Sequence, residues 1–366
     1  MVGRCLFVLL LFTSCIEQFQ PKVDEPDELP LVIDGLITNE FKNHRININR
    51  VNTLAGPVQF NFEDEAKVYV ESSGGEIFEF SNIGNGSYIS DQAFAGTIGE
   101  SYKLVINLEG KTYESSIEEM PKTAEIDSIK AKYEIKSIQD ETGDLVNKPL
   151  ISILIDVKLS DEQDYYMRLD WEATYKAKTP NQGLGVCWTE AGREPPDNLD
   201  PDKICYVNEN STSFLNVLTS DGIDRLTIKD YEAYSVSPNK RIQFMYSPKI
   251  YLYSMAKSSY DFWNAVKNQV ENTGSLFDAP PTPIGGNIFN MENVNERVLG
   301  IFEVASVNSK REFFLRSIIT DELDNYNADC SPSGGQLSPP PPPPLYCCEC
   351  TFLPNSSDKK PDFWED

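Results

Sequence analysis

The stretch that decides the fold is "GESYKLVINLEGKTYESSIEEM", residues 99–120. On both sides of the pair Glu109-Gly110, polar and apolar residues alternate, which is the period of a half-buried β-strand. Two alternating runs joined by such a glycine-containing pair are a strong signal for a β-hairpin. The stretch therefore predicts two antiparallel strands in an all-β domain.

Short strands with turn residues between them extend this pattern back to Leu31. The quoted runs are "LVIDGLI" at 31–37, "HRININRV" at 44–51, "AKVYVES" at 66–72 and "EIFEF" at 76–80. Strands at this spacing are typical of a small antiparallel sandwich. We therefore predict an immunoglobulin-like β-sandwich over residues 31–121, with Pro121 at its boundary.

A second β-rich domain is predicted over residues 122–320, beginning with "IDSIKAKYEI" and continuing with "LISILIDVKL". It includes "YYMRLDWEATY", residues 165–175, in which alternate residues share one face of a strand. That face carries Tyr165, Met167, Leu169 and Trp171. Such an aromatic row can form a platform for a sugar, but an apolar face with a period of two more often lies in the core. We expect it to be buried.

One helix is predicted in this β-rich chain, at about residues 255–273. Its apolar stripe recurs at spacings of three and four residues, and Gly274 follows where a C-terminal cap belongs. The stripe consists of Met255, Ser259, Phe262, Val266 and Val270. We expect the helix to pack on the edge of a sheet rather than to offer a groove to a partner.

The N-terminus, "MVGRCLFVLLLFTSC", has the layout of a secretory signal. Arg4 precedes an apolar run from Leu6 to Phe12, which is too short to span a bilayer, and small residues follow before Cys15. The arrangement resembles the lipobox of bacterial lipoproteins, in which the cysteine is diacylated. We therefore predict a signal peptide over residues 1–14 and a lipid anchor, palmitate included, at Cys15; the alternative is an ordinary signal peptide with Cys15 in a disulfide.

Residues 15–30 are acidic, rich in proline and poor in apolar side chains, so they read as an extended tether. In Bacteroidota, acidic residues behind the lipidated cysteine resemble the signal for the outer face of the outer membrane; a merely solvated linker is the alternative. No later stretch reaches the ~18 apolar residues that a membrane helix needs. We therefore expect the rest of the chain to be soluble and tethered.

The charge of the chain excludes two classes of partner. It has 32 basic and 57 acidic residues, a net charge of −25, and losing residues 1–14 removes only Arg4 and leaves −26. Such a surface repels nucleic acid and anionic lipid headgroups.

The motifs of common enzymes are missing from the sequence. His44 is the only histidine, which excludes histidine-rich zinc sites and makes histidine-based triads improbable; we expect it to be exposed. There is no P-loop, no G-x-G-x-x-G after a strand and no G-x-S-x-G. We therefore predict no catalytic residues. Paired carboxylates for glycoside cleavage stay an alternative, although nothing selects one pair among 57 acidic residues.

No cofactor or metal site is predicted. The acidic clusters at 197–203 and 321–329 could offer oxygen ligands to a structural calcium ion, but neither has the spacing of a calcium-binding loop, so solvated loops are favoured. "DSI" at 127–129 resembles the Bacteroidota O-glycosylation sequon, which would place a sugar on Ser128.

Six cysteines remain beyond Cys15, an even number that predicts disulfides in an exported chain. They are Cys187, Cys205, Cys330, Cys347, Cys348 and Cys350. We predict a bridge from Cys187 to Cys205, which would close a polar excursion without a core of its own. The Pro/Cys-rich tail, residues 321–366, would be clasped by Cys330 with one of its three clustered cysteines.

The tail also contains "PPPPPPLYCCEC", residues 339–350, in which the prolines predict a stiff polyproline II spacer. Because vicinal cysteines are strained partners, Cys347 and Cys348 are not expected to pair with each other. A zinc knuckle would need reduced thiolates, which an exported location disfavours. "DFW" at 362–364 offers aromatic surface for docking the end of the chain.

Taken together, these motifs resemble one family of Bacteroidota lipoproteins, the domain of unknown function 4249. The resemblance rests on the lipobox, "LVIDGLITNE", "GSYIS", "GESYKLVINLEGKTYES", "IDSI", the pair Cys187 and Cys205, "FWNAVKNQVENTGSLFDAPPTPIGGNIFN", "VLGIFEVAS", "CCECT" and "KPDFW". The six prolines and Cys348 depart from the usual C-x-x-C tail of the family.

The resemblance implies a location more than an activity. Family members are similar to surface lipoproteins encoded beside TonB-dependent transporters of the outer membrane, and they bring no catalytic residues. We therefore expect a non-enzymatic, outward-facing outer-membrane lipoprotein that caps or accompanies a β-barrel partner in nutrient uptake, through loops such as 187–205 and 276–290. The alternatives are an accessory subunit of an outer-membrane assembly or secretion machine, and a carbohydrate-active enzyme with two carboxylates.

Overall fold

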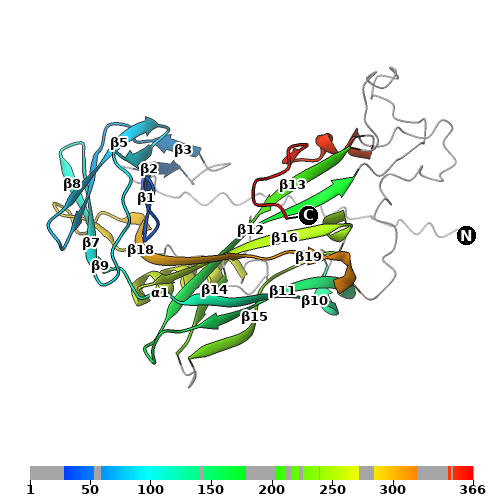
Figure 1. Cartoon of the computed structure of the whole chain (residues 1–366). Helices are drawn as coiled ribbons and strands as arrows, with labels where there is room; N and C mark the ends of the chain where they lie inside the picture. The colour runs from blue at the N-terminus through cyan, green and yellow to red at the C-terminus, as the bar shows by residue number, and fades with distance from the viewer. Residues whose placement is uncertain are drawn as a thin grey trace, which may run out of the picture.

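The computed structural model contains two β-domains that share one long strand (Figure 1). It describes residues 29–52, 59–140, 143–178, 203–211, 216–221, 226–238, 240–271, 284–319, 345–347 and 349–365. Among these residues α1 is the one α-helix, so the prediction of a mainly β chain with one or two helices is confirmed. No helix in the described ranges has the length and apolar character needed to cross a membrane.

The first domain is built mostly from the N-terminal strands. These are β1 (Leu31–Thr38), β2 (Arg45–Asn52), β3 (Gln59–Phe62), β4 (Lys67–Ser72), β5 (Ile77–Gly84), β6 (Ser87–Ser90), β7 (Ser101–Leu108), β8 (Lys111–Ser115) and β9 (Glu118–Glu119). Two later strands join them, β17 (Ile288–Asn290) and the first half of β18 (Val298–Arg311). Pairing runs in the order β18–β1–β2–β6–β5–β4–β7–β8–β17, with β3 and β9 alongside β2 and β7.

The predicted hairpin is confirmed as β7 and β8. Leu108 pairs with Lys111, which leaves Glu109 and Gly110 as a two-residue turn. Both have a positive φ, 53° and 79°, as a type I′ turn requires. The alternation of β7 then buries Tyr102, Leu104 and Ile106 in the core of the first domain.

The first domain is completed by residues that the sequence analysis assigned to the second. β17 pairs with β8, while β18 runs parallel to β1 from Val298 to Ala305. Ile288, Phe302 and Val304 lie in the first core. The predicted domain at 31–121 is therefore not self-contained, because its sheet includes β18, which begins only at Val298.

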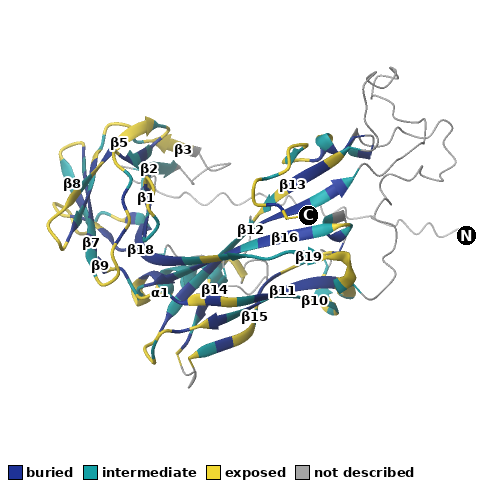
Figure 2. Cartoon of the chain, viewed as in Figure 1, coloured by how far each residue is buried: buried dark blue, intermediate teal, exposed yellow. Residues whose placement is uncertain are grey.

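The second domain is a sandwich of two sheets. One sheet contains β10 (Glu125–Gln139), β11 (Leu145–Lys158) and β15 (Thr227–Val236). The other contains β12 (Tyr166–Lys178), β13 (Ile204–Asn210), β14 (Asn216–Thr219), β16 (Met245–Met255), the second half of β18, β19 (Phe314–Leu315) and β20 (Ser356–Ser357). Buried residues run along these strands, and exposed residues lie in the loops and also on β10, β11 and β15 (Figure 2).

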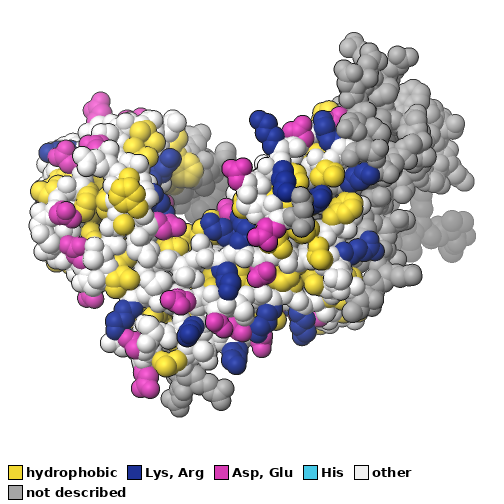
Figure 3. Space-filling view, viewed as in Figure 1, with side chains coloured by type: hydrophobic (Ala, Val, Ile, Leu, Met, Phe, Trp, Pro, Cys, Tyr) yellow, Lys and Arg dark blue, Asp and Glu magenta, His cyan; other side chains and the backbone are white. Residues whose placement is uncertain are grey.

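β18 joins the domains as a continuous strand. Its residues from Ala305 to Arg311 pair with β16, so one strand belongs to both cores. At this junction the guanidinium of Arg168 lies 3.2 Å from the buried carboxylate of Glu303, which also accepts a 2.6 Å hydrogen bond from the indole of Trp263. Arg168 also lies over the ring of Tyr253, 4.2 Å from its centroid. A shared strand and a buried ion pair fix how the domains meet, and a hollow separates the domains on the face seen in Figure 3.

The helix α1 (Lys257–Glu271) lies within the predicted range and packs against β12, β14 and β18. This confirms its expected place at the edge of a sheet. The predicted apolar stripe is only partly right: Ser259 is buried, but Val270 is 60% exposed. Phe262 and Val266 are half-buried, so the burial of the stripe decreases toward the C-terminal end of the helix. Gly274 lies outside the described residues.

Four short 3-10 helices complete the described elements: η1 (Lys240–Ile242), η2 (Arg316–Ile318), η4 (Leu345–Cys347) and η5 (Cys350–Phe352). The last two belong to the C-terminal tail, which packs on the second domain. Trp364 is 4% exposed and contacts the rings of Tyr206 and Phe313. The predicted docking of "DFW" is therefore confirmed, while residues 339–344, the proline run, lie outside the described residues.

Candidate functional site

A pocket of about 830 Å³ opens on the second domain, where β12, β13 and β15 meet the end of α1. Its volume falls within the ~300–1,000 Å³ typical of small-molecule sites. The aromatic part of its lining comes from Trp171, Tyr175, Tyr231 and Tyr234. Such a pocket can hold a ligand without any rearrangement of the two sheets.

The aromatic row of β12 leads into this pocket. Tyr165, Met167 and Leu169 are buried in the second core, which confirms their expected role. Trp171 is the exception, because it is only partly buried and lines the pocket. Tyr234 of β15 stacks on it, with ring centroids 4.0 Å apart and planes 9° from parallel. The sequence placed Trp171 on the correct face but could not show that a pocket opens beside it.

The polar end of the pocket is already internally paired. The Nε of Arg241 donates to Glu209 over 2.6 Å, and the hydroxyls of Tyr234 and Tyr246 lie 2.9 Å apart. Burial raises the pKa of Tyr231 and raises that of Tyr234 further. These phenols therefore stay neutral across physiological pH, which suits them to hydrogen bonding rather than to proton transfer.

The C-terminal tail forms one wall of the pocket. Pro354 and Asn355 line it, and the carbonyl of Asn355 accepts a hydrogen bond from the Asn208 amide over 3.1 Å. The disulfide between Cys205 and Cys350, with Cα atoms 5.8 Å apart, attaches this wall to β13. The pocket therefore depends on two segments that lie 145 residues apart in the sequence.

This disulfide overturns the predicted bridge between Cys187 and Cys205, because Cys205 pairs with Cys350 instead. β13 aligns Cys205 beside the tail rather than beside the excursion before it. Cys347 is also disulfide-bonded. Cys15, Cys187, Cys330 and Cys348 lie outside the described residues, so their predicted roles stay predictions.

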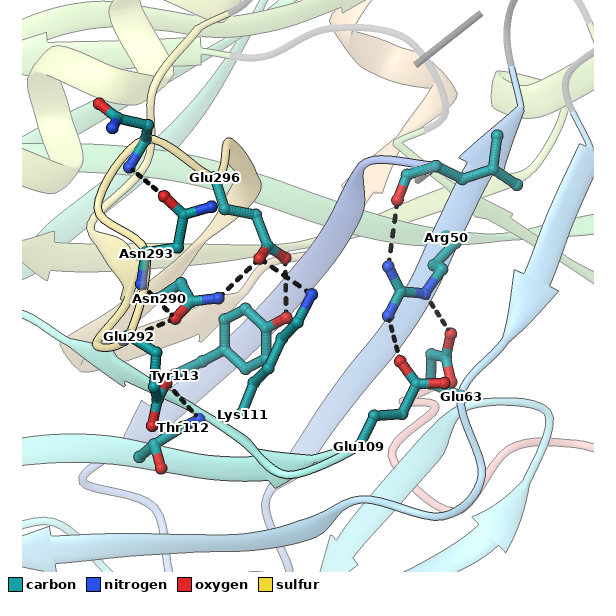
Figure 4. Close-up of polar contacts among 12 residues, drawn as sticks. Arg50, Glu63, Glu109, Lys111, Thr112, Tyr113, Asn290, Glu292, Asn293 and Glu296 are labelled. Carbon is teal, nitrogen blue, oxygen red and sulfur yellow. Dashed lines mark hydrogen bonds and ion pairs between the residues drawn. The ribbon is translucent and has the colours of Figure 1, made fainter. Parts of the chain in front are cut away.

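A second candidate surface is the loop between β17 and β18, residues 291–297, which the close-up in Figure 4 shows against the β7–β8 hairpin. The buried carboxamide of Asn290 accepts hydrogen bonds from the backbone amides of Glu292 and Asn293. The carboxylate of Glu296 accepts from Asn290 at 2.6 Å, from the hydroxyl of Tyr113 at 2.8 Å and from Lys111 at 3.2 Å. The loop is thus held by its polar side chains.

The protonation state of Tyr113 and the ion pairs of Arg50 stabilise this network. Burial and the neighbouring Glu296 raise the pKa of Tyr113 to about 12, so its hydroxyl stays a donor to that carboxylate. In the same view, Arg50 binds Glu63 at 2.6 Å and Glu109 at 3.0 Å, which ties β2 to the hairpin turn (Figure 4). The loop and the turn beside it form one rigid polar support.

The loop and its approach from β17 nevertheless display apolar side chains to solvent. Phe289, Met291 and Val294 are 51%, 55% and 82% exposed. They lie among exposed polar residues of the same loop, Glu292, Asn293 and Asn295. Apolar residues that are exposed together in this way often mark an interaction site. Phe289 falls within the loop 276–290 that was predicted to contact a partner; residues 272–283 and 179–202 lie outside the described residues.

The family model "Domain of unknown function (DUF4249)" matches residues 16–311. The chain belongs to this family. No curated protein sequence matches this DUF4249 chain.

Among solved structures, the DUF4249 chain is similar to one titled "Biofilm associated protein - BSP domain", with 6% identity. The alignment covers 80% of this chain and 62% of that one, so the chain spans less than two thirds of the length of that structure. The TM-score of 0.11 is too low to support an argument about fold or function.

Ser128 and His44 of the DUF4249 chain both lie in defined surroundings. Ser128 is half-buried on β10, and its hydroxyl donates to Asp156 over 3.0 Å, so its glycosylation stays a prediction. His44 was expected to be exposed but is 1% exposed, because the strands around it enclose its ring against Phe94. Its Nε2 donates to the carbonyl of Phe94 over 3.0 Å.

The candidate calcium clusters at 197–203 and 321–329 lie outside the described residues, apart from Lys203. Within the described ranges, no group of three or more His, Cys, Asp or Glu side chains is placed to hold a metal ion. Among the described residues, the candidate functional surfaces are therefore the aromatic pocket and the apolar loop.

Proposed function

We propose that this DUF4249 protein is a non-enzymatic lipoprotein of the outer membrane, anchored at Cys15, that accompanies or caps a TonB-dependent β-barrel transporter in nutrient uptake. The family description names no function, so the proposal rests on the sequence features and on the surfaces described above. It assigns the lipid anchor to the N-terminus and partner contact to the first domain.

The disulfides support export. The bond between Cys205 and Cys350, together with the oxidised Cys347, is typical of a protein that folds in an oxidising compartment. A signal-like N-terminus ending in Cys15 agrees with that compartment.

The observation that carries the partner role is the apolar loop. Asn290 and Glu296 hold its backbone in place before any partner arrives, so little conformational entropy is lost on docking. Phe289, Met291 and Val294 then provide apolar contacts of the kind that anchor protein interfaces. Such preorganised apolar contacts also suit a partner that is embedded in a membrane.

The test is affinity purification from detergent-solubilised outer membranes, with mass spectrometry of what co-purifies. The wild-type chain should retain a TonB-type barrel, and the triple variant Phe289→Ser, Met291→Ser, Val294→Ser should lose it. The matched control replaces two exposed apolar residues of the second domain, Ile135→Ser and Leu145→Ser, and should retain the barrel.

Two results would contradict the proposal. Co-purification of an assembly-factor barrel instead of a transporter would indicate that the protein is a subunit of an outer-membrane assembly machine. Cleavage of a glycan by the purified chain, abolished by one Asp or Glu substitution, would make it an enzyme. Separately, Cys15→Ala should release the protein from membranes, since the other described segments offer no spanning helix.

A further inference from the structure

We propose that the pocket around Trp171 binds a neutral oligosaccharide. This inference does not depend on the transporter partner, because the pocket lies on the second domain and the apolar loop on the first. It rests on three features of the pocket: a fixed aromatic wall, neutral polar groups without a partner among the described residues, and charges that are already paired.

The aromatic wall is set before a ligand arrives. Tyr234 is buried and stacks on Trp171, which holds the indole in one orientation, while Trp171 and Tyr231 stay partly exposed. The hydroxyl of Tyr231 donates to Asn216 over 2.6 Å, which fixes this ring as well. The apolar C–H face of a pyranose packs on such rings, and rigid rings lose little conformational entropy when it does.

The polar groups that remain available are neutral. Tyr175 is 1% exposed and lines the pocket, and its hydroxyl forms no hydrogen bond with another described residue. The side chain of Asn210 likewise has no partner in the described part of the chain, and Asn208 uses only its oxygen, toward Thr174 at 2.7 Å. Carboxamides and phenols both donate and accept, as do sugar hydroxyls.

Each charged group of the lining lies beside a group of opposite charge. Glu209 binds Arg241 at 2.6 Å, Glu232 binds Lys136, and Glu271 lies 3.9 Å from Lys267. A charged ligand would have to break one of these pairs and leave its partner uncompensated, which is costly where the pair is partly buried. A neutral ligand displaces only water, so the pocket selects against acidic glycans and charged peptides.

The disulfide-held tail limits the size of the ligand. Pro354 and Asn355 close one side of the pocket, and the space of about 830 Å³ suits a few sugar units rather than one or a long chain. The ligand class is therefore a short neutral oligosaccharide, or a segment of a longer neutral glycan.

The experiment measures binding by isothermal titration with the full mature chain. The probes are the hexaoses of cellulose, starch, xylan, mannan and laminarin, with hexagalacturonate and a charged hexapeptide for comparison. We expect at least one neutral hexaose to bind and both charged probes to fail. Trp171→Ala should weaken that binding at least ~10-fold through loss of the aromatic wall, and Tyr175→Phe about 5-fold through loss of one hydrogen bond.

Two variants keep the test independent of folding. Tyr175→Phe removes a single oxygen and leaves the packing intact, so its effect does not reflect unfolding. Tyr251→Ala removes an aromatic ring from β16, on the opposite face of the same sheet, and should bind like wild type. The proposal is overturned if none of the neutral hexaoses binds, if a charged probe binds in a Trp171-dependent manner, or if glycan binding survives both pocket substitutions.

Discussion

Asn287 hydrogen-bonds with both atoms of its side-chain amide to the backbone of Phe302, donating to its carbonyl over 2.8 Å and accepting from its amide over 2.9 Å. The side chain of Asn287 thus makes the two backbone hydrogen bonds to Phe302 of β18 that a neighbouring strand would otherwise make. The same carboxamide also donates to the buried carboxylate of Glu118 over 2.9 Å. One residue thus joins the end of the first domain's sheet to the strand that leaves it.

Replacing Asn287 should destabilise the protein strongly. Asn287→Ala would leave the amide and carbonyl of Phe302 buried without partners, and each such group costs ~1–3 kcal/mol. We expect the free energy of unfolding to fall by about 3 kcal/mol, measured by urea titration followed by circular dichroism. The exposed Asn295→Ala should change it by less than ~0.5 kcal/mol; an equal effect of the two variants would mean that the Asn287 bonds do not hold the sheet.

Two neighbouring glycines offer a matched test of the β1–β18 pairing. Gly300 has φ +88°, and a Cβ on it would lie 2.0 Å from the carbonyl oxygen of Ile33 on β1. Gly300→Ala should therefore cost roughly 2–4 kcal/mol or prevent folding. At Gly285 no atom lies within 4 Å of an added Cβ, so Gly285→Ala should be nearly neutral. Similar melting temperatures for the two variants would rule out the tight parallel pairing.

His44 should make stability depend on pH. Burial, with the ring packed against Phe94, lowers the pKa of His44 from 6.5 to about 4, so the folded protein keeps it neutral. Between pH 6.5 and about 4 the imidazole is protonated in the unfolded chain but still neutral in the folded chain. The free energy of unfolding therefore decreases as the pH is lowered from 6.5 to about 4, and it levels off below that pH.

Because His44 is the only histidine, its ring protons give a single NMR titration, provided that any histidine tag is removed. We expect a midpoint near pH 4. Lowering the pH from 7 to 4 should reduce the free energy of unfolding of the wild type by up to ~3 kcal/mol more than that of His44→Gln, because the variant has no imidazole to protonate. A midpoint near 6.5 would show an exposed ring and contradict the structure.

The disulfide between Cys205 and Cys350 should matter for the tail and for the pocket together. Cys205→Ser with Cys350→Ser should lower the free energy of unfolding by ~2–5 kcal/mol, because the bond constrains a long loop of the unfolded chain. Limited proteolysis should then cut between Cys350 and Trp364, and ligand affinity should fall with loss of the Asn355 wall. Either single variant should match the double one; an undisturbed tail in all three would mean that aromatic docking alone holds it.

Local features of the fold could be predicted from the sequence because they depend on short-range chemistry. The turn at Glu109-Gly110 needs only two residues that accept a positive φ, and the burial of Met167 and Leu169 needs only a period of two. α1 and the docking of Trp364 were accessible in the same way, from spacing and from aromatic content.

Predictions that depended on distant segments were the ones that failed. Cys205 pairs with Cys350 because β13 lies beside β20, a contact that neither local sequence reveals. His44 is buried because the bridge between Lys42 and Phe94 closes over it. Trp171 lines a pocket rather than the closed core because β13, β15 and the tail leave an open space beside it.

By itself, the sequence determined the β class, the hairpin at Glu109-Gly110 and the helix, since each depends on local periodicity or on turn chemistry. The lipid anchor at Cys15 stays a prediction. Only the tertiary structure decided that β18 serves both domains, that Asn287 takes the place of a strand, and that the tail completes an aromatic pocket. Those relations join residues far apart in the chain, and chain folding alone brings them within bonding distance.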